Sequence, residues 1–557
     1  MFSELSKKRK MTVLAGILTG MLLSTLTSTI VSTAMPKILS DLGGMEYLSW
    51  ALTAYMLTST ISIPIFGKLA DMYGRKPFYL GGVVVFLAGS ILCGTSTTMT
   101  QFIIYRAVAG LGGGIMQSNS LAIVADIFPP AERGKYQGLM GGVFGLSSVI
   151  GPTLGGYITD NLNWSWVFWV NIPIGLLAII ILGAGLPYAK QTDVKKDIDY
   201  LGTAFIIAAF TPLLIAFSWA GTKYAWNSKE ILGLLVFSFI SLVIFIFVES
   251  KAKEPIVPLS LFKNSIFNVS ALTGFFMAIG MFGTIMYIPM FVQGVLGKTA
   301  SNSGLITTPM MLGLVIASTI SGQIVSRTGK YKKLALSGFA IMAAGMVLLS
   351  FMGVNTTDTT VVINMIITGV GIGITMPVFV IAVQSAFPHN QVGVVTASVQ
   401  FFRNIGGTFG IAVMGSILNS RFRSEALKAI PDTVKKILPP EGQNIFDTPQ
   451  TLFNPKALDM IKEKLPSEMP ELFTKLMGDL KKALEISIQH VFFTEILVVL
   501  GALIITFSLK EIPLRKSNRP IQEEAGVEML AEGLAVEGSL LPSEGEPDLA
   551  GDGDEKA

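Results

Sequence analysis

The chemically capable groups of this chain are a few charged residues that border or interrupt long apolar segments. Asp71, Arg75 and Lys76 stand in the stretch Gly67–Pro77, which joins one apolar segment to the next. An aspartate and two cations at a membrane face can pair across helices in one conformation and separate in another, as a switch requires. The alternative is that the cations only fix topology or extend toward water. We interpret Asp71 and Arg75 as gating residues because the aspartate opposes the local excess of positive charge.

Two further ionisable residues stand in the fourth apolar segment. Arg106 lies a few residues inside it, where a charge is costly and usually faces a cavity or a partner. It could instead extend to the interface, or attract an anionic headgroup. Asp126, near the opposite end, is the best candidate for a proton-carrying acid, the alternative being a helix-end partner for Arg133.

The composition indicates an integral membrane protein. Of 557 residues, 51% are hydrophobic and only 14% are charged, and the mean hydropathy is +0.61. A soluble chain of this length carries far more charge. Apolar runs of about 20 residues, each long enough to cross a bilayer as a helix, recur along the chain. The single cysteine and two distant histidines predict neither a disulfide nor a metal site, and no pattern indicates an enzyme.

We expect an all-α fold of fourteen transmembrane helices, in two six-helix bundles with an inserted pair between them. The predicted spans are 11–34, 48–69, 78–97, 102–126, 136–158, 165–187, 199–219, 230–249, 267–293, 303–326, 333–353, 360–384, 394–419 and 488–509. The predicted domains are an N-terminal segment (1–10), an N-terminal bundle (11–187), the inserted pair (199–249), a C-terminal bundle (267–510) with a long outer loop (420–487), and a disordered acidic tail (522–557).

Charge distribution predicts the orientation and the surroundings of these spans. Loops on the side of the N-terminus are rich in lysine and arginine, whereas the short loops of the other side are nearly bare. Because such positive charge stays cytoplasmic, both termini are predicted to be cytoplasmic, with the chain in the cell membrane. Within the long outer loop we expect short amphipathic helices at 455–465 and 470–488, which form either a solvated cap or a gate.

An internal repeat supports the two-bundle arrangement. A degenerate copy of the charged loop begins at Gly322, 255 residues after Gly67, and has Ser326 in place of Asp71. Three glycines of the fourth span match three of the twelfth at a constant offset of 259: Gly110, Gly112 and Gly114 match Gly369, Gly371 and Gly373. Many secondary transporters are duplicated in this way, with a substrate path between the halves.

Four glycine-rich or charged motifs carry a family resemblance. They are the loop Gly67–Pro77, the fourth-span stretch Tyr105–Gly110, the fifth-span stretch Gly145–Gly156, and Gln400–Gly407 in the penultimate span. Over residues 11–510 they resemble the major facilitator superfamily, specifically its fourteen-helix drug:proton antiporter branch. The resemblance implies the major-facilitator fold and a central role in proton coupling for Arg106.

The same resemblance implies a function. The expected activity is export of hydrophobic or amphipathic small molecules by proton antiport with alternating access, energised by the proton gradient without a cofactor. We expect the bilayer and the substrate as partners, no nucleic acid, and a monomer. The alternatives are a dedicated exporter of a lipid-like or anionic metabolite, and a non-transporting membrane sensor or scaffold.

A proline and three glycines of the fifth span form a candidate hinge. Pro152 cannot donate a helical hydrogen bond and should kink the helix. Gly151, Gly155 and Gly156 remove side chains around it, so that a neighbouring helix can approach closely. We predict a hinge or a tight seam between the halves, the alternative being ordinary small-residue packing.

The sequence departs from the branch at Thr27, where the first span usually carries an aspartate. The acids within or bordering spans are Asp71, Asp126, Glu249 and Glu495, and none is predicted at mid-membrane; Glu495 is expected near the outer end of the last span. A neutral, zwitterionic or anionic substrate is therefore favoured over a permanent dication. Candidate cavity residues are polar groups of apolar spans, which could equally join helices: Thr27, Gln117, Asn119, Gln293, Gln384, Gln400, Arg403 and Asn404.

Overall fold

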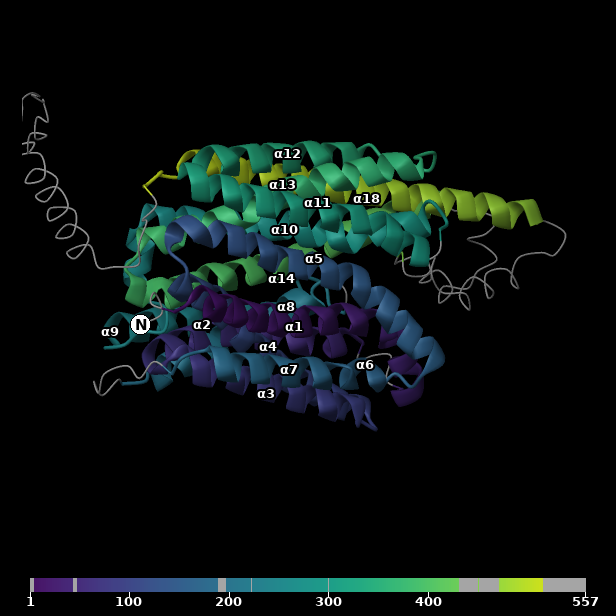
Figure 1. Ribbon diagram of the computed structural model, residues 1–557. Helices are drawn as coiled ribbons and strands as arrows, with labels where there is room; N and C mark the ends of the chain where they lie inside the picture. The colour runs from purple at the N-terminus through teal and green to yellow at the C-terminus, as the bar shows by residue number, and fades with distance from the viewer. Residues whose placement is uncertain are drawn as a thin grey trace, which may run out of the picture. The chain divides into compact units, whose positions relative to one another are not determined.

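The computed structural model describes residues 5–43, 48–188, 197–221, 223–298, 300–429, 449 and 470–513. The described part of the chain folds into long helices (Figure 1). The predicted helix at 455–465 and the predicted acidic tail at 522–557 lie outside these residues.

The helices follow the predicted spans closely. They are α1 (Lys7–Leu42), α2 (Leu48–Tyr73), α3 (Arg75–Gly94), α4 (Met99–Ile127), α5 (Pro130–Asn161), α6 (Trp166–Trp169), α7 (Asn171–Gly185), α8 (Tyr200–Trp219), α9 (Lys229–Lys251), α10 (Ser265–Gly294), α11 (Ala300–Thr328), α12 (Lys332–Ser350), α13 (Asp358–Ala386), α14 (Val392–Ala429) and α18 (Pro470–Phe507), with 3₁₀ turns η2 (Leu259–Lys263) and η3 (His389–Gln391). Within the described ranges, thirteen helical segments are long and apolar enough to span a bilayer, which is compatible with the fourteen predicted.

The internal repeat is visible in the packing of glycines. Helices α4 and α13 both have 29 residues and begin 259 residues apart. In α4, Gly110 abuts the backbone of Tyr55 in α2; in α13, Gly369 abuts the backbone of Met310 in α11. Tyr55 and Met310 are themselves separated by the 255 residues that separate the two charged loops. Equivalent residues therefore make equivalent contacts, which confirms that the two bundles are built alike.

Both copies of the charged loop turn at a glycine with positive φ. The φ angle is 101° at Gly74, between α2 and α3, and 68° at Gly329, between α11 and α12. Residues with a side chain rarely adopt a positive φ angle, whereas glycine adopts it readily. These two glycines let each helix follow its predecessor almost directly.

The two bundles meet along two helix pairs, α5 with α11 and α2 with α14. Gly134 of α5 and Gly322 of α11 pack backbone against backbone, and a side chain on either would overlap the other. At the equivalent place in the second pair, Gly393 of α14 packs against Asp71 of α2. Glycines thus permit the closest approach of the bundles in both pairs.

The inserted pair α8–α9 lies against this seam. Phe210 and Phe217 of α8 pack edge-to-face against Phe401 and Phe409 of α14, with ring centroids 4.7 and 5.0 Å apart. Helix α8 also packs on α2. Helix α9 keeps a row of apolar side chains exposed, as expected of a helix that faces lipid: Val236, Phe237, Phe239, Ile240, Val243 and Phe247, each more than half exposed.

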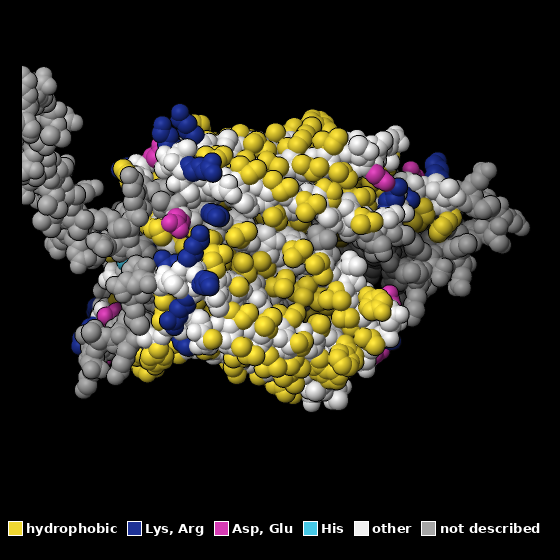
Figure 2. Space-filling model, in the orientation of Figure 1, with side chains coloured by type: hydrophobic (Ala, Val, Ile, Leu, Met, Phe, Trp, Pro, Cys, Tyr) yellow, Lys and Arg dark blue, Asp and Glu magenta, His cyan; other side chains and the backbone are white. Residues whose placement is uncertain are grey.

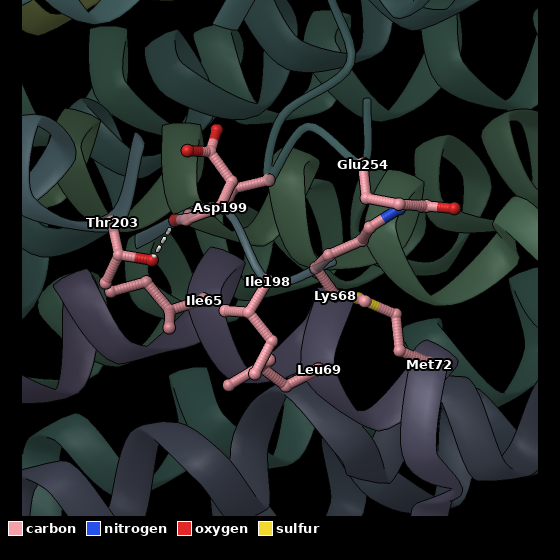
Figure 3. Close-up of a pocket in the computed structure, with 9 residues that line it drawn as sticks. Ile65, Lys68, Leu69, Met72, Ile198, Asp199, Thr203 and Glu254 are labelled. Atoms are coloured by element: carbon pink, nitrogen blue, oxygen red, sulfur yellow. Dashed lines mark hydrogen bonds and ion pairs between the residues drawn. The ribbon is translucent and has the colours of Figure 1, made fainter. Parts of the chain in front are cut away.

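A small pocket marks where the inserted pair meets α2 (Figure 3). Beside it, Lys68 Nζ lies 2.7 Å from Glu254 Oε2. The Thr203 hydroxyl donates to the Asp199 carbonyl across 2.7 Å, within the first turn of α8. The Lys68–Glu254 ion pair fastens the segment after α9 to the N-terminal bundle, and the Thr203 bond stabilises the start of α8.

Lysine and arginine gather at the end of the bundles where α1 begins (Figure 2). We call it the basic end; it carries Arg75, Lys76, Arg133, Lys135, Lys332 and Lys333. The asymmetry is the one from which the sequence predicts orientation.

The structure corrects the ends of the long outer loop. Helix α14 continues to Ala429 instead of ending at 419, and α18 begins at Pro470 instead of 488. The separate helix predicted at 470–488 is therefore wrong, because it is the first half of α18. The extensions are stable because Phe422 of α14 is buried in one cluster with Leu476 and Leu480 of α18.

Candidate functional site: a latch between the bundles

Arg75, at the start of α3, lies between two carboxylates. Its guanidinium pairs with Asp71 in the last turn of α2, and its Nε donates to Asp126 Oδ2 at the end of α4 across 3.0 Å. The three side chains are only 6–10% exposed. Charge-assisted hydrogen bonds in so dry a site are strong, so they fix the α2–α3 turn against α4.

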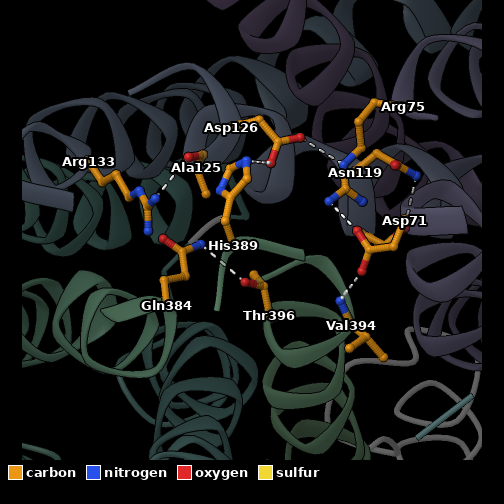
Figure 4. Close-up of polar contacts among 11 residues, drawn as sticks. Asp71, Arg75, Asn119, Ala125, Asp126, Arg133, Gln384, His389, Val394 and Thr396 are labelled. Atoms are coloured by element: carbon orange, nitrogen blue, oxygen red, sulfur yellow. Dashed lines mark hydrogen bonds and ion pairs between the residues drawn. The ribbon is translucent and has the colours of Figure 1, made fainter. Parts of the chain in front are cut away.

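Both carboxylates also reach the C-terminal bundle (Figure 4). The Val394 N–H, in the first turn of α14, donates to Asp71 Oδ2 across 2.6 Å. The first N–H groups of a helix have no partner within it and carry partial positive charge, so they favour a carboxylate. Asp126 Oδ1 lies 3.7 Å from Nε2 of His389 in η3. We call Asp71, Arg75, Asp126, His389 and the Val394 N–H the latch.

A second polar contact closes the same end. Gln137 of α5 donates to Gln384 of α13 across 3.2 Å, and Gln384 donates to Thr396 of α14 across 3.1 Å. Nearby, the Arg133 guanidinium donates to the carbonyls of Ala125 and Phe128, 2.9 and 3.1 Å away. With Gly134 packed on Gly322, the bundles are in contact at the basic end, and Gln384 belongs to this closure.

The closure is asymmetric despite the repeat. Ser326, which replaces Asp71 in the second copy, has no hydrogen-bond partner for its Oγ among the described residues. It lines a pocket between the basic ends of α5 and α11, together with Lys135 and Arg327. The ionic latch therefore operates at the α2–α14 pair, and glycine contact operates at the α5–α11 pair.

Arg106 is not part of the latch. It precedes Asp126 by twenty residues in α4, about 30 Å along a helix. Its side chain is 3% exposed. Nε donates to the Ala51 carbonyl across 3.3 Å, the guanidinium lies 4.7 Å from the centre of the Tyr55 ring, and Nη1 has no partner among the described residues. Of the four predicted coupling residues, the structure thus joins Asp71, Arg75 and Asp126 and leaves Arg106 apart.

The predicted cavity residues are scattered. Gln117 of α4 and Asn404 of α14 meet across the seam, with 3.5 Å between Oε1 and Nδ2. Thr27 is fully buried within the N-terminal bundle, where its hydroxyl donates to Asn171 Oδ1 across 3.0 Å. Gln293 donates to Ser303 of α11 across 3.3 Å.

The remaining three differ in their surroundings. Asn119 is fully buried and donates to the Ile115 carbonyl across 2.8 Å. Gln400 is 3% exposed. Arg403, one residue before Asn404, packs beside Gly274 of α10. Gln117 and Asn404 are thus the predicted cavity residues that meet where α4 and α14 face each other.

The candidate hinge occupies a different place from the seam. Helix α5 runs without interruption through position 152. Gly151 and Gly155 pack against Thr29 and Thr33 of α1, in the same bundle, and a side chain at Gly156 would contact nothing. The predicted seam between halves at these glycines is therefore wrong: only the basic-end part of α5 faces α11. The hinge role stays a prediction.

Sequence reasoning missed two functional candidates. His389 reaches the latch from the short 3₁₀ turn η3, and one histidine without a spacing pattern gave no signal. Glu495 lies within a predicted span, but the prediction puts it too near the outer end of that span. The predicted span begins at residue 488, whereas α18 begins at Pro470. The apolar–polar periodicity of 470–488, read as a separate helix, was the signal that could have located it.

Two repeated bundles of long apolar helices that meet at a polar contact have the architecture of a membrane transporter. Residues 17–411 match the family model described as Major Facilitator Superfamily, and the chain belongs to that family.

The similar proteins agree with this assignment. The chain is 40% identical over 546 residues to the multidrug transporter protein MdtP of Bacillus subtilis, covering 96% of this chain and 99% of that one. It is 36% identical to multidrug resistance protein 3 of Bacillus subtilis, over 89% and 94% of the two chains. The crystal structure of the human organic anion transporter MFSD10 shares the fold, with a TM-score of 0.56 and 14% identity over 88% of this chain and 99% of that one.

Proposed function

We propose that this transporter exports hydrophobic or amphipathic compounds across the cell membrane by proton antiport. The relatives whose names state multidrug transport support the substrate class. The latch is the observation that carries the mechanism, because it ties titratable groups of one bundle to the other. The protein acts as a monomer, takes its energy from the proton gradient and uses no cofactor. The basic end is cytoplasmic, as its charge favours.

In this proposal the described conformation is closed to the cytoplasm. Opening requires Asp71 to leave the Val394 N–H and Asp126 to leave His389. A proton on Asp126 removes the charge that holds Arg75 and so weakens the closed form. Proton binding and opening are then linked: whatever binds one conformation more tightly shifts the equilibrium toward it.

The second candidate is a dedicated exporter of an anionic or lipid-like metabolite. The observation that favours it is Arg106, a buried cation whose Nη1 has no partner, and whose contacts include no carboxylate, within the part of the chain that the structure describes. A ligand anion would complete its hydrogen bonding.

Reconstituted transport with an imposed pH gradient tests the proposal. We expect gradient-driven dye export by the parent and at least about tenfold less by Asp126→Asn, within the range of typical coupling free energies. Glu132→Gln is the matched control, because Glu132 is exposed at the same end; its export should stay within about twofold. Export that persists after the gradient is collapsed would refute proton coupling. Binding of one anionic lipid or metabolite, without dye export, would favour the second candidate.

A further inference from the structure

Glu495 lies deep within the C-terminal bundle. It is twelve residues before Phe507, the end of α18 at the basic end, which is about 18 Å along the helix. Its carboxyl group faces Gly283 and Thr284, near the middle of α10. The sequence-based expectation of a position near the outer end of the last span is therefore wrong.

The carboxyl group is sealed from solvent and scarcely bonded. Glu495 is 0% exposed. The Thr284 hydroxyl lies 3.4 Å from Oε2, while Oε1 has no hydrogen-bond partner among the described residues. A side chain at Gly283 would overlap Oε1. This glycine therefore leaves the room that the carboxyl group occupies.

No described cation contacts this carboxyl group. Helix α10, which packs against the Glu495 carboxyl group, has no charged residue. Its titratable side chain nearest the carboxyl group is Tyr287, whose hydroxyl donates to the Ile411 carbonyl across 3.2 Å. Helix α12 presents Met342 and Met346 beside Gly280, and its lysines stand in its first turn at the basic end.

The charges of α14 and α18 are also distant. Arg403 of α14 packs at Gly274, nine residues before Gly283 and so about 14 Å away along α10. The other charges of α14 lie at or beyond Arg421. On α18, His490 Nδ1 is bonded to the Ile486 carbonyl, and Glu485 is ion-paired with Lys482 at 2.5 Å.

An ionised carboxylate without a cation costs several kcal/mol in such surroundings. Acids inside membrane segments are for this reason rare and usually functional. A neutral carboxyl group fits the described conformation, and access of water in another conformation would let its O–H bond break, the proton leaving to water and the electron pair staying on the carboxylate. An antiporter needs a group that alternates in this way.

We propose that Glu495 is a proton-binding site of the C-terminal bundle, one that holds its proton in the closed conformation and exchanges it when the bundles move. The inference rests on the proposed function for its role in transport. Its protonation can be measured independently.

Infrared spectroscopy of the full chain in lipid nanodiscs tests the site directly. We expect a protonated-carboxyl band at neutral pH that is lost in Glu495→Gln and kept in Glu485→Gln, the matched control on the same helix. In Thr284→Val the band should change frequency, because the carboxyl group loses the hydroxyl that lies 3.4 Å from its Oε2. An unchanged band in Glu495→Gln overturns the inference.

Transport separates this inference from the proposed function. Glu495→Gln should lose at least about tenfold of gradient-driven efflux while substrate counterflow at equal pH stays within about twofold. If the parent is gradient-driven and Glu495→Gln is equally so, the inference fails alone. If the parent shows no gradient-driven efflux, antiport fails, and the infrared band still decides whether Glu495 binds the proton. Should Glu495→Gln not fold, the band of Thr284→Val decides: a band frequency equal to that of the parent overturns the site.

Discussion

Arg75→Ala is expected to open the basic end and to lower gradient-driven efflux by at least about tenfold. Arg75 is the cation that Asp71 and Asp126 share, and all three side chains are nearly buried. Removing one partner from a buried ion pair leaves an uncompensated charge and typically costs about 3–5 kcal/mol. The cost falls on the closed form, in which both carboxylates are buried. In the open form water hydrates both carboxylates, so the equilibrium shifts toward opening.

Distances between spin labels report the opening. Labels at positions 132 and 327 lie on opposite bundles, at exposed positions of the basic end. Their separation should lengthen in Arg75→Ala. The single native cysteine, Cys93, is buried and adds little background labelling.

Lys76→Ala is the matched control for this experiment. Lys76 is the neighbouring cation, but it donates to the carbonyls of Gly183 and Leu186, within the same bundle. Its loss should leave the label distance unchanged and efflux within about threefold. If Arg75→Ala matched Lys76→Ala in both measurements, the latch would have no role in switching.

The elements of the fold were accessible from the sequence because membrane helices depend on local composition. Each span needs about 20 apolar residues, and that pattern places its helix to within a few residues. The duplicated glycines predicted contacts between distant helices. Gly110 and Gly369 each stand where the backbone of a neighbouring helix comes too close for a side chain. The C-terminal end of α14 and the N-terminal end of α18 were predicted wrongly, because their polar exposed faces lower the mean hydropathy of these segments.

The site was accessible only in part, for a physical reason. Asp71 and Arg75 are four residues apart and flank the tight turn at Gly74, so their pairing is a local contact. His389 meets Asp126 only because two bundles fold together, and sequence separation hides such a contact. Gln384 shows the same effect: it was predicted to line a cavity, but its neighbour across the seam is Gln137.

The repeat explains why the two seams have different chemistry. Equivalent glycines bring both helix pairs close, but the serine at position 326 removes the acid from one of them. The α2–α14 seam thus contains a charged group, the Asp71 carboxylate, whereas the α5–α11 seam contains packed glycine backbone. Because the two seams use different groups, each seam can be perturbed separately.

Gly134→Ala is expected to weaken closure without touching any charge. The added methyl would overlap the backbone of Gly322, which has no flexible side chain to move aside. Overpacking of this kind typically costs about 1–3 kcal/mol, and here the closed form alone bears it. We expect at least about fivefold slower efflux and a longer distance between labels at positions 132 and 327.

Gly156→Ala is the matched control on the same helix, because a methyl there would contact nothing. Replacing a helical glycine by alanine contributes up to about 1 kcal/mol of stability, so this variant should unfold at the same or a higher temperature and transport normally. Loss of transport in Gly156→Ala would instead support the hinge predicted at 151–156. Normal transport in Gly134→Ala would show that the α5–α11 contact tolerates separation, and that the ionic latch alone closes the basic end.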